Sequence, residues 1–483
     1  MDCRLDPCDF LVRSFRLRSV SWCAIALVWC VLLAGCGSGQ SSSATATSSS
    51  TGSGTPASTP GTSAPTSGAS GTGTSGGGGS QVLSSPFVYV SETSQSFSSG
   101  NAGGSFSGLI EAFVLNGSSG VLSPLPGSPF STNYSTGGDM AFAPHGAFAY
   151  VLAESYPAGT CCIGPTSILV YALDPASGTP TLKQALATTG ASEVSRISVH
   201  PSGNFIYVTP YNDNSGNAGI GAFSVQSDGT VAFVGFTQAQ SEGAATISPN
   251  GTFLYTNSDG APIGNWPSTQ ACGPVNENLS AFSISSTTGA LTPVAGSPFI
   301  FQRQVCDVGH APQYLTKQSD PSGQRLFVID SGNATVTVFA IDPSTGALTL
   351  LPGTSTDGSV AGFYSSTIDP MGRFLYIGSI ISSFTGFSLA ASTATGTLPV
   401  LTGMPVQVTA SMNDEGSTTM AIDSSGSYLF SNQNDYTSAF SCCGADALVE
   451  FQVNPTTGAL TQLPSTPITL AGTASKIVAA PPQ

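Results

Sequence analysis

The chain has 483 residues, of which only 8% are charged, and its formal net charge is −15. It contains 57 glycines and 33 prolines, well above the ~12% that the two together take in average proteins. This composition excludes long surface helices, which need lysine, glutamate and arginine on their wet face, and it favours short strands joined by many turns. It also excludes a nucleic-acid partner, since phosphate binding needs a clustered basic surface.

Residues 1–36 predict an export signal. The apolar run 20–33, about 14 residues long, suits the core of a signal peptide but is short of the ~20 residues that span a bilayer. Four arginines precede the run, which ends in Leu33-Ala34-Gly35-Cys36. This ending resembles the lipobox of bacterial lipoproteins, which implies that Cys36 is lipidated. The alternative is a simple signal peptide with an unmodified cysteine.

A lipid on Cys36 would hold the mature chain on the membrane, because each buried methylene contributes about 0.8 kcal/mol. We therefore expect an extracytoplasmic protein anchored to the bacterial cell envelope. Gly37, not aspartate, follows the cysteine, and the lipoprotein resemblance then implies the outer membrane in a Gram-negative cell.

Residues 37–80 consist almost wholly of serine, threonine, glycine, alanine and proline. Such a stretch cannot bury enough apolar surface to offset the entropy of ordering it, so we expect a disordered tether. Its sequence GTSGG (73–77) formally matches the esterase pattern G-x-S-x-G, but no strand precedes it and no helix pattern follows, so the match is read as chance.

From residue 81 to 483 the chain repeats itself. One short apolar run recurs seven times, in chain order as FVYVS (87–91), FAYVL (148–152), FIYVT (205–209), FLYTN (253–257), RLFVI (325–329), FLYIG (374–378) and YLFSN (428–432). Three further runs recur with it, each four to seven residues long and bounded by turn-forming residues. This is typical of strands, and four strands in each of seven units predict an all-β, seven-bladed β-propeller with antiparallel blades.

The first repeat lacks its innermost strand, and a copy of that strand stands at the C-terminus, at 475–480. We expect the C-terminal strand to complete the N-terminal blade and close the ring, which removes exposed sheet edges. In this arrangement the residues of the apolar runs form the hydrophobic core between neighbouring blades. Only Trp266 remains after the signal, which excludes tryptophan-dependent WD40 repeats.

The repeats TVTVFAIDPSTGALTLLPG (335–353), LSAFSISSTTGALTPVAGSPF (279–299) and DPMGRFLYIG (369–378) resemble the seven-bladed lactonase family, which includes bacterial 6-phosphogluconolactonase. The resemblance covers 81–483 and implies a hydrolase of a small lactone. The His-Pro-His stretch of those lactonases is absent here, and Arg196 stands where a family histidine would open the third inner strand.

The connections into the innermost strands share one face with the loops between second and third strands, so their polar side chains should converge on the central channel. A histidine, an arginine and carboxylates could polarise a lactone carbonyl and activate water there. The candidate catalytic residues are Asp139, Glu193, Arg196, Glu242, His310 and Glu415, with Asp414 and Lys476 at the same mouth. His145 and His200 are expected at the surface of the opposite rim.

We expect a small-molecule ligand at the channel, a monomer, and neither a metal nor another cofactor. The polar stretch 212–217 lacks the first aspartate and the closing glutamate of an EF-hand loop. Two functions remain open: hydrolysis of a small lactone or ester, or a non-catalytic role as a ligand-binding or cell-envelope scaffold.

Six cysteines follow Cys36, and an even number in an exported chain suggests disulfides. A bridge from Cys272 to Cys306 would close a loop of about 34 residues, worth roughly 3–4 kcal/mol in the chain-entropy model. For the adjacent pairs, vicinal disulfides and cross-links between the two loops both remain open: Cys161, Cys162, Cys442 and Cys443.

Overall fold

The chain divides into two compact units, Met1–Gly79 and Ser80–Gln483. A computed structural model describes parts of the second unit only: residues 87–96, 105–155, 166–192, 195–213, 216–239, 242–262, 272–306, 315–331, 333–357, 362–379, 383–390, 395–408, 417–433 and 445–479. The predicted signal, the lipidation site Cys36 and the tether therefore lie outside the described residues. None of the described segments forms a helix of the length and hydrophobicity needed to cross a bilayer.

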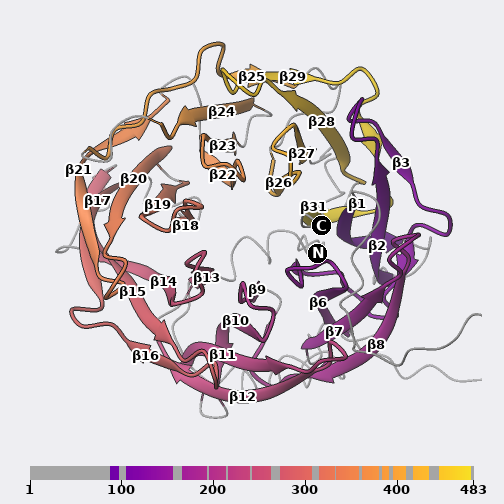
Figure 1. Cartoon of the computed structure of the whole chain (residues 1–483), viewed down its shortest axis with the longest axis horizontal. Helices are drawn as coiled ribbons and strands as arrows, with labels where there is room; N and C mark the ends of the chain where they lie inside the picture. Colours follow the sequence, from indigo (N-terminus) through magenta and orange to yellow (C-terminus); the bar gives the residue numbers. More distant parts are fainter. Residues whose placement is uncertain are drawn as a thin grey trace, which may run out of the picture. The chain divides into compact units, whose positions relative to one another are not determined.

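The described residues of the second unit form seven antiparallel sheets arranged as the blades of a ring (Figure 1). The predicted seven-bladed β-propeller is confirmed. Blade 1 contains β31 (Thr473–Ala479), β1 (Phe87–Ser96), β2 (Ser105–Leu115), β3 (Leu122–Pro124) and β4 (Phe130–Ser131). Blade 2 contains β5 (Met140–Phe142), β6 (Phe148–Glu154), β7 (Thr166–Leu173) and β8 (Pro180–Ala187). Blade 3 contains β9 (Arg196–Val199), β10 (Phe205–Asn212), β11 (Ala218–Val225) and β12 (Val231–Gln238).

The remaining four blades repeat the same order from the channel outward. Blade 4 contains β13 (Glu242–Ile247), β14 (Phe253–Pro262), β15 (Cys272–Ile284), β16 (Leu291–Pro293) and β17 (Phe299–Cys306). Blade 5 contains β18 (Leu315–Ser319), β19 (Arg325–Asp330), β20 (Thr335–Ile341) and β21 (Leu348–Thr356). Blade 6 contains β22 (Phe363–Ile368), β23 (Phe374–Ser379), β24 (Ser383–Ser388) and β25 (Val406–Gln407). Blade 7 contains β26 (Met420–Ile422), β27 (Tyr428–Gln433), β28 (Ala447–Val453), β29 (Leu460–Gln462) and β30 (Ile468–Thr469).

The C-terminal strand closes the ring as the sequence predicted. β31 pairs with β1, with Val88 opposite Ala479 and Val90 opposite Ile477, and a register shift follows Ser91. Each innermost strand contacts the next, and β31 contacts both β26 and β5. Figure 1 shows β31 beside β1 on the inner side of the ring.

Seven hydrophobic clusters fill the seven gaps between neighbouring blades. Alternate residues of β1 point to opposite neighbours: Phe87 and Tyr89 pack towards blade 2, whereas Val88 and Val90 pack towards blade 7. Both faces of such a strand are covered, which explains why the repeated runs are apolar at consecutive positions.

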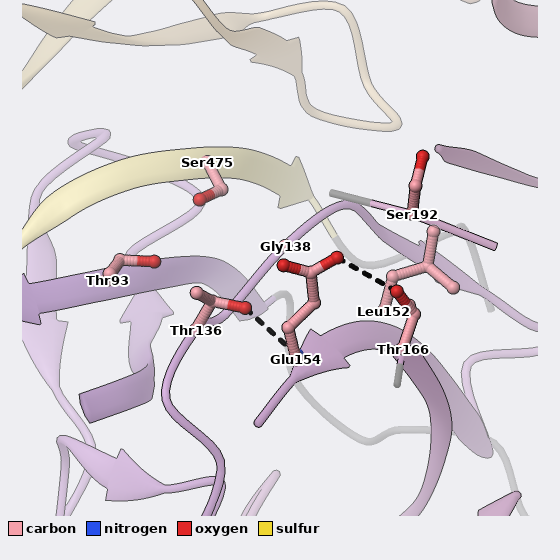
Figure 2. A pocket seen from close by; sticks show the side chains of 8 residues that line it. All are labelled: Thr93, Thr136, Gly138, Leu152, Glu154, Thr166, Ser192 and Ser475. Carbon is pink, nitrogen blue, oxygen red and sulfur yellow. Dashed lines mark hydrogen bonds between the residues drawn. The ribbon is translucent and has the colours of Figure 1, made fainter. Parts of the chain in front are cut away.

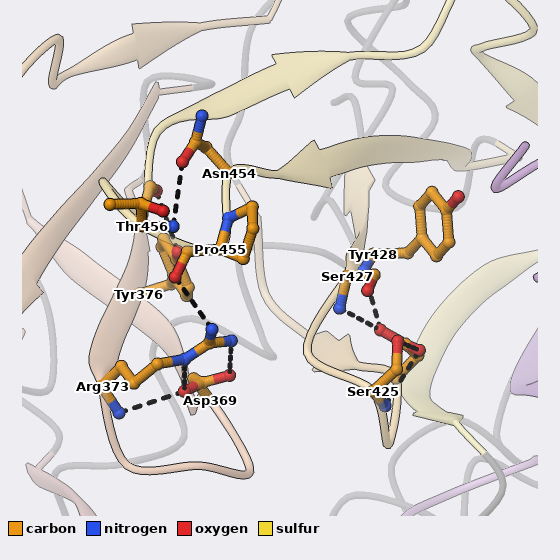
Figure 3. A network of polar contacts seen from close by, with 11 residues as sticks. Asp369, Arg373, Tyr376, Ser425, Ser427, Tyr428, Asn454, Pro455 and Thr456 are labelled. Atoms are coloured by element: carbon orange, nitrogen blue, oxygen red, sulfur yellow. Dashed lines mark hydrogen bonds and ion pairs between the residues drawn. The ribbon is translucent and has the colours of Figure 1, made fainter. Parts of the chain in front are cut away.

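The rim opposite the predicted channel mouth consists of turns that lock neighbouring blades together (Figure 3). The carboxylate of Asp369 accepts hydrogen bonds from Nε and Nη2 of Arg373, each at 2.8 Å, and Nη1 of Arg373 donates to the carbonyl oxygen of Pro455 in blade 7. His145 is exposed there, as expected. His200 lies in the turn after β9, as expected, but the expectation that it is at the surface was wrong: it is buried, with Nε2 2.7 Å from the carbonyl oxygen of Gly251 in blade 4.

Candidate functional site

Most of the predicted catalytic residues are not tested by the structure. Glu193, His310 and Glu415 lie outside the described residues, as does Asp414. Glu242 begins β13, where only its backbone is described. Their proposed role at the channel stays a prediction.

The structure does bring Asp139 and Arg196 close together in the sequence-predicted region. Asp139 is buried just before β5, and its Oδ2 accepts a hydrogen bond from the backbone amide of Ile197 at 2.8 Å. Arg196, the neighbour of Ile197, is exposed at the start of β9 and donates from Nη1 to the carbonyl of Ser195. Asp139 thus joins blades 2 and 3 at the start of the inner strand β9, where Arg196 lies.

A cavity of about 180 Å³ opens on this face, near the junction of blades 1 and 2. The ends of β1 and β6, the start of β7, the inner strand β31 and the connections before β5 and β9 all contribute to it (Figure 2). Six of its eight lining residues have polar side chains, and Gly138 and Leu152 do not: Thr93, Thr136, Gly138, Leu152, Glu154, Thr166, Ser192 and Ser475.

Glu154 provides the only carboxylate among the described lining residues. It is the last residue of β6, its side chain is only 2% exposed, and its Oε1 accepts a hydrogen bond from the hydroxyl of Thr166 at 2.9 Å. The two residues are directly opposite each other in the β6–β7 ladder, so strand pairing fixes their relative position. A carboxylate held in this way can accept a proton from a water molecule in the cavity.

Two further hydroxyls have their acceptor side engaged by the backbone. The amide of Gly137 donates to Oγ1 of Thr93 at 3.3 Å, and the amide of Glu154 donates to Oγ1 of Thr136 at 3.0 Å. Since a hydroxyl has one proton to donate as well as two acceptor positions, each of these threonines keeps a donor for a ligand oxygen. Figure 2 shows both side chains at the cavity.

Sequence reasoning did not single out Glu154. The sequence predicts a core strand at FAYVL (148–152), whereas the observed strand β6 continues to Glu154, and six of its seven residues are buried. Glu154 could have been noticed because it is an acidic residue at the end of an apolar strand, and the loops of the predicted site begin at that end. A buried charge rarely occurs without a partner or a function.

A second polar cluster joins blades 4 and 5. Nε of Arg303 donates to Glu277 at 2.7 Å, and Nη1 donates to both carboxylate oxygens of Asp330 at 3.1 Å. Nearby on the inner strand of blade 5, the buried ammonium of Lys317 donates to Oδ1 of Asn257. Paired and buried in this way, these charges hold the blades together.

Three carboxylates meet at the closing seam between blades 7 and 1. The side chain of Glu92 is fully buried, neither of its carboxylate oxygens makes a well-formed hydrogen bond, and burial raises its pKa to about 9, with Glu111 and Asp446 adding repulsion. Glu111 accepts from the amide of Ala471, and Asp446 accepts from that of Ala474. Within the described residues, no group of three or more histidine, cysteine or acidic side chains is arranged to hold a metal ion.

The description "Lactonase, 7-bladed beta-propeller" belongs to the family model that matches this chain, in two overlapping segments at 110–294 and 230–359. Together these segments cover more than half of the sequence, from β2 in blade 1 to the end of blade 5, and the chain belongs to this family. The resemblance found in the repeats is confirmed.

Solved structures support the same fold. A putative 6-phosphogluconolactonase from Bacteroides uniformis is 16% identical, with a TM-score of 0.56 over 82% of this chain and 99% of that one. A periplasmic gluconolactonase from Pseudomonas aeruginosa is 16% identical, with a TM-score of 0.55 over 82% and 99% of the two chains. At this identity the likeness concerns the fold alone. No curated protein matches the chain by sequence.

Proposed function

We propose that this protein is an extracytoplasmic, lipid-anchored hydrolase that opens a small lactone or related cyclic ester in the cavity between blades 1 and 2. The observation that carries the proposal is the buried carboxylate of Glu154, oriented by Thr166 at a polar cavity on the face where the blade connections converge. Membership of the lactonase family supports the reaction class.

In the proposed reaction, Glu154 accepts a proton from a water molecule whose oxygen attacks the lactone carbonyl carbon. The carbonyl oxygen becomes an oxyanion, and the hydroxyls of Thr93 and Thr136 donate to it. The tetrahedral intermediate then collapses, the ring C–O bond breaks, and the proton held by Glu154 passes to the leaving alkoxide. The product is the open hydroxy acid.

The proposed location rests on the sequence ending the apolar run, Leu33-Ala34-Gly35-Cys36. It is supported by the structural neighbour from Pseudomonas aeruginosa, whose name describes it as periplasmic. A Cys36→Ala variant should move from the membrane fraction to the soluble fraction. An unchanged membrane fraction would contradict the anchor.

The catalytic test compares two buried carboxylates. Glu154→Gln should lower kcat for a lactone by about 10²–10⁴-fold, the usual contribution of a general base. Glu450→Gln is the matched control, because Glu450 is equally buried but lies on β28 in blade 7, away from the cavity. Equal activity of the Glu154→Gln variant and the parent would refute the role of Glu154. Arg196→Ala and His310→Ala test the residues predicted from sequence in the same assay.

Binding without turnover is the second candidate function. It is favoured by the cavity lining, in which the described residues include no histidine, lysine or arginine to stabilise an oxyanion. Saturable binding of a lactone with no hydrolysis above the spontaneous rate would select this alternative.

A further inference from the structure

We propose that the cavity at Glu154 takes an uncharged, hydroxyl-rich lactone ring and discriminates against the phosphorylated form of the same ring. The inference rests on the proposed function for the site, and it specifies the chemical class of the substrate. Two independent observations carry it: the chemistry of the lining, and the positions of all basic side chains of the exported chain.

The described lining is suited to neutral polar ligands. It holds the hydroxyls of Thr93, Thr136, Thr166, Ser192 and Ser475 together with the carboxylate of Glu154. Hydroxyls both donate and accept hydrogen bonds, so they match the hydroxyls of a sugar-derived ring. The one ionisable side chain of the described lining is a carboxyl group: it offers a phosphate dianion no positive charge, and in its ionised form it would repel the dianion.

Proteins bind phosphate with arginine, with lysine or at helix N-termini. The described residues contain no helix. Seven basic residues follow Cys36, all within the described ranges, and five of them are engaged in contacts elsewhere: Lys183 with Asp228, Arg303 with Glu277 and Asp330, Lys317 with Asn257, Arg325 with Asp320, and Arg373 with Asp369.

The two remaining basic side chains, Arg196 and Lys476, are on the inner strands β9 and β31 but are not part of the cavity lining. The cavity therefore lacks the paired cations that bidentate phosphate binding uses. Its volume of about 180 Å³ is below the ~300–1,000 Å³ of most ligand pockets, which suits a small ligand such as a single ring.

The test measures hydrolysis of D-glucono-1,5-lactone and of its 6-phosphate by the mature protein. We expect kcat/KM to be at least tenfold higher for the unphosphorylated lactone, and the ratio to shrink as salt rises, because screening weakens the repulsion. Ser475→Lys adds a cation to the lining and should narrow the ratio. Thr287→Lys adds the same charge in the exposed turn after β15, on the opposite rim, and should leave it unchanged.

Equal or better turnover of the phosphorylated lactone would overturn the inference while leaving the proposed function intact. Turnover of neither lactone would overturn the proposed function, and binding then decides the inference. In that case, titration calorimetry with 1,5-anhydro-D-glucitol and its 6-phosphate should show tighter binding of the uncharged ring. Binding of neither compound, or tighter binding of the phosphate, would overturn the inference.

Discussion

The hydroxyl of Tyr89 in blade 1 donates a hydrogen bond of 2.6 Å to the carbonyl oxygen of Gly178 in blade 2. Gly178 has a φ of 71°, and a Cβ placed on it would lie 2.7 Å from the ring of Phe87, so the turn needs glycine for both reasons. The same contact recurs from Tyr207 to Gly289 and from Tyr376 to Gly458. In these three pairs the tyrosine of an F-x-Y motif binds the glycine of an S-G or T-G turn in the next blade, so the two repeated motifs connect neighbouring blades.

Removing this hydroxyl should destabilise the propeller. Tyr89→Phe leaves the buried carbonyl of Gly178 without its side-chain donor, and we expect a loss of about 1–2 kcal/mol in the free energy of unfolding. Tyr150 is the matched control, since its buried hydroxyl has no hydrogen-bond partner among the described residues. Tyr150→Phe should be neutral or slightly stabilising in the same urea titration. Equal losses in both variants would show that the hydrogen bond to Gly178 does not matter.

Deleting residues 475–483 should destabilise the fold and promote aggregation. The deletion removes most of β31, which exposes the edge of β1 and uncovers the cluster containing Val88, Val90 and Ile477. Thermal melting and light scattering of the truncated protein measure both effects. An unchanged melting curve would contradict closure of the ring by the C-terminal strand.

The fold was predictable because the sequence pattern of the same four strands recurs in each blade. The phase of the repeat even identified the closing strand, expected at 475–480 and found at Thr473–Ala479. The bend of the outer strands was harder to foresee. In blades 1, 4 and 7 the outermost strand divides into two pieces on either side of a cis-proline: Pro129, Pro298 and Pro467.

The candidate site was predictable only as a region. Symmetry indicates which face carries the loops, but it does not indicate which polar side chain faces a cavity and which one satisfies a neighbouring backbone. Asp139, expected at the channel, accepts the amide of Ile197 in the next blade, and its catalytic role stays a prediction. Glu154 follows the predicted strand run 148–152 and lines the cavity. Both are buried acidic side chains, and only their three-dimensional contacts distinguish them.

The closing seam should lose stability as pH rises. The pKa of Glu92 is raised from 4.5 to about 9, mainly by burial, with repulsion from Glu111 and Asp446. The folded state then holds a proton that the unfolded state releases above pH 4.5, so the stabilisation is complete below that pH and is lost as pH rises towards 9. Within this window the free energy of unfolding should fall by up to about 1.4 kcal/mol per pH unit.

Glu92→Gln replaces the carboxyl group with an amide that does not ionise, so the variant lacks the pH dependence that Glu92 contributes. The variant and the parent should have similar urea midpoints near pH 4.5, and the variant should be the more stable of the two at pH 9. Burial also raises the pKa of Glu450, but hydrogen bonds from the hydroxyl of Ser465 and the amide of Leu122 oppose that rise, so Glu450→Gln should show a weaker effect. Parallel stability curves for Glu92→Gln and the parent would refute the assignment.

The proposed disulfide between Cys272 and Cys306 now has a structural argument. Cys272 is the first residue of β15 and Cys306 the last of β17, and the two lie directly opposite each other in the ladder. Opposed residues in an antiparallel pair have Cα atoms about 4.5–5.5 Å apart, within the range that a disulfide spans. Peptide mapping of the exported protein without reductant should recover the two cysteines in one cross-linked peptide pair.

Cys272→Ser and Cys306→Ser should each lower the melting temperature of the oxidised protein, and the double variant should lose no more than either single one, because all three lack the same bridge. Adding a reductant should bring the parent down to the level of the variants. The cysteine pairs at 161–162 and 442–443 lie outside the described residues, and the same map assigns their partners. Recovery of Cys272 or Cys306 as a free thiol would refute the bridge.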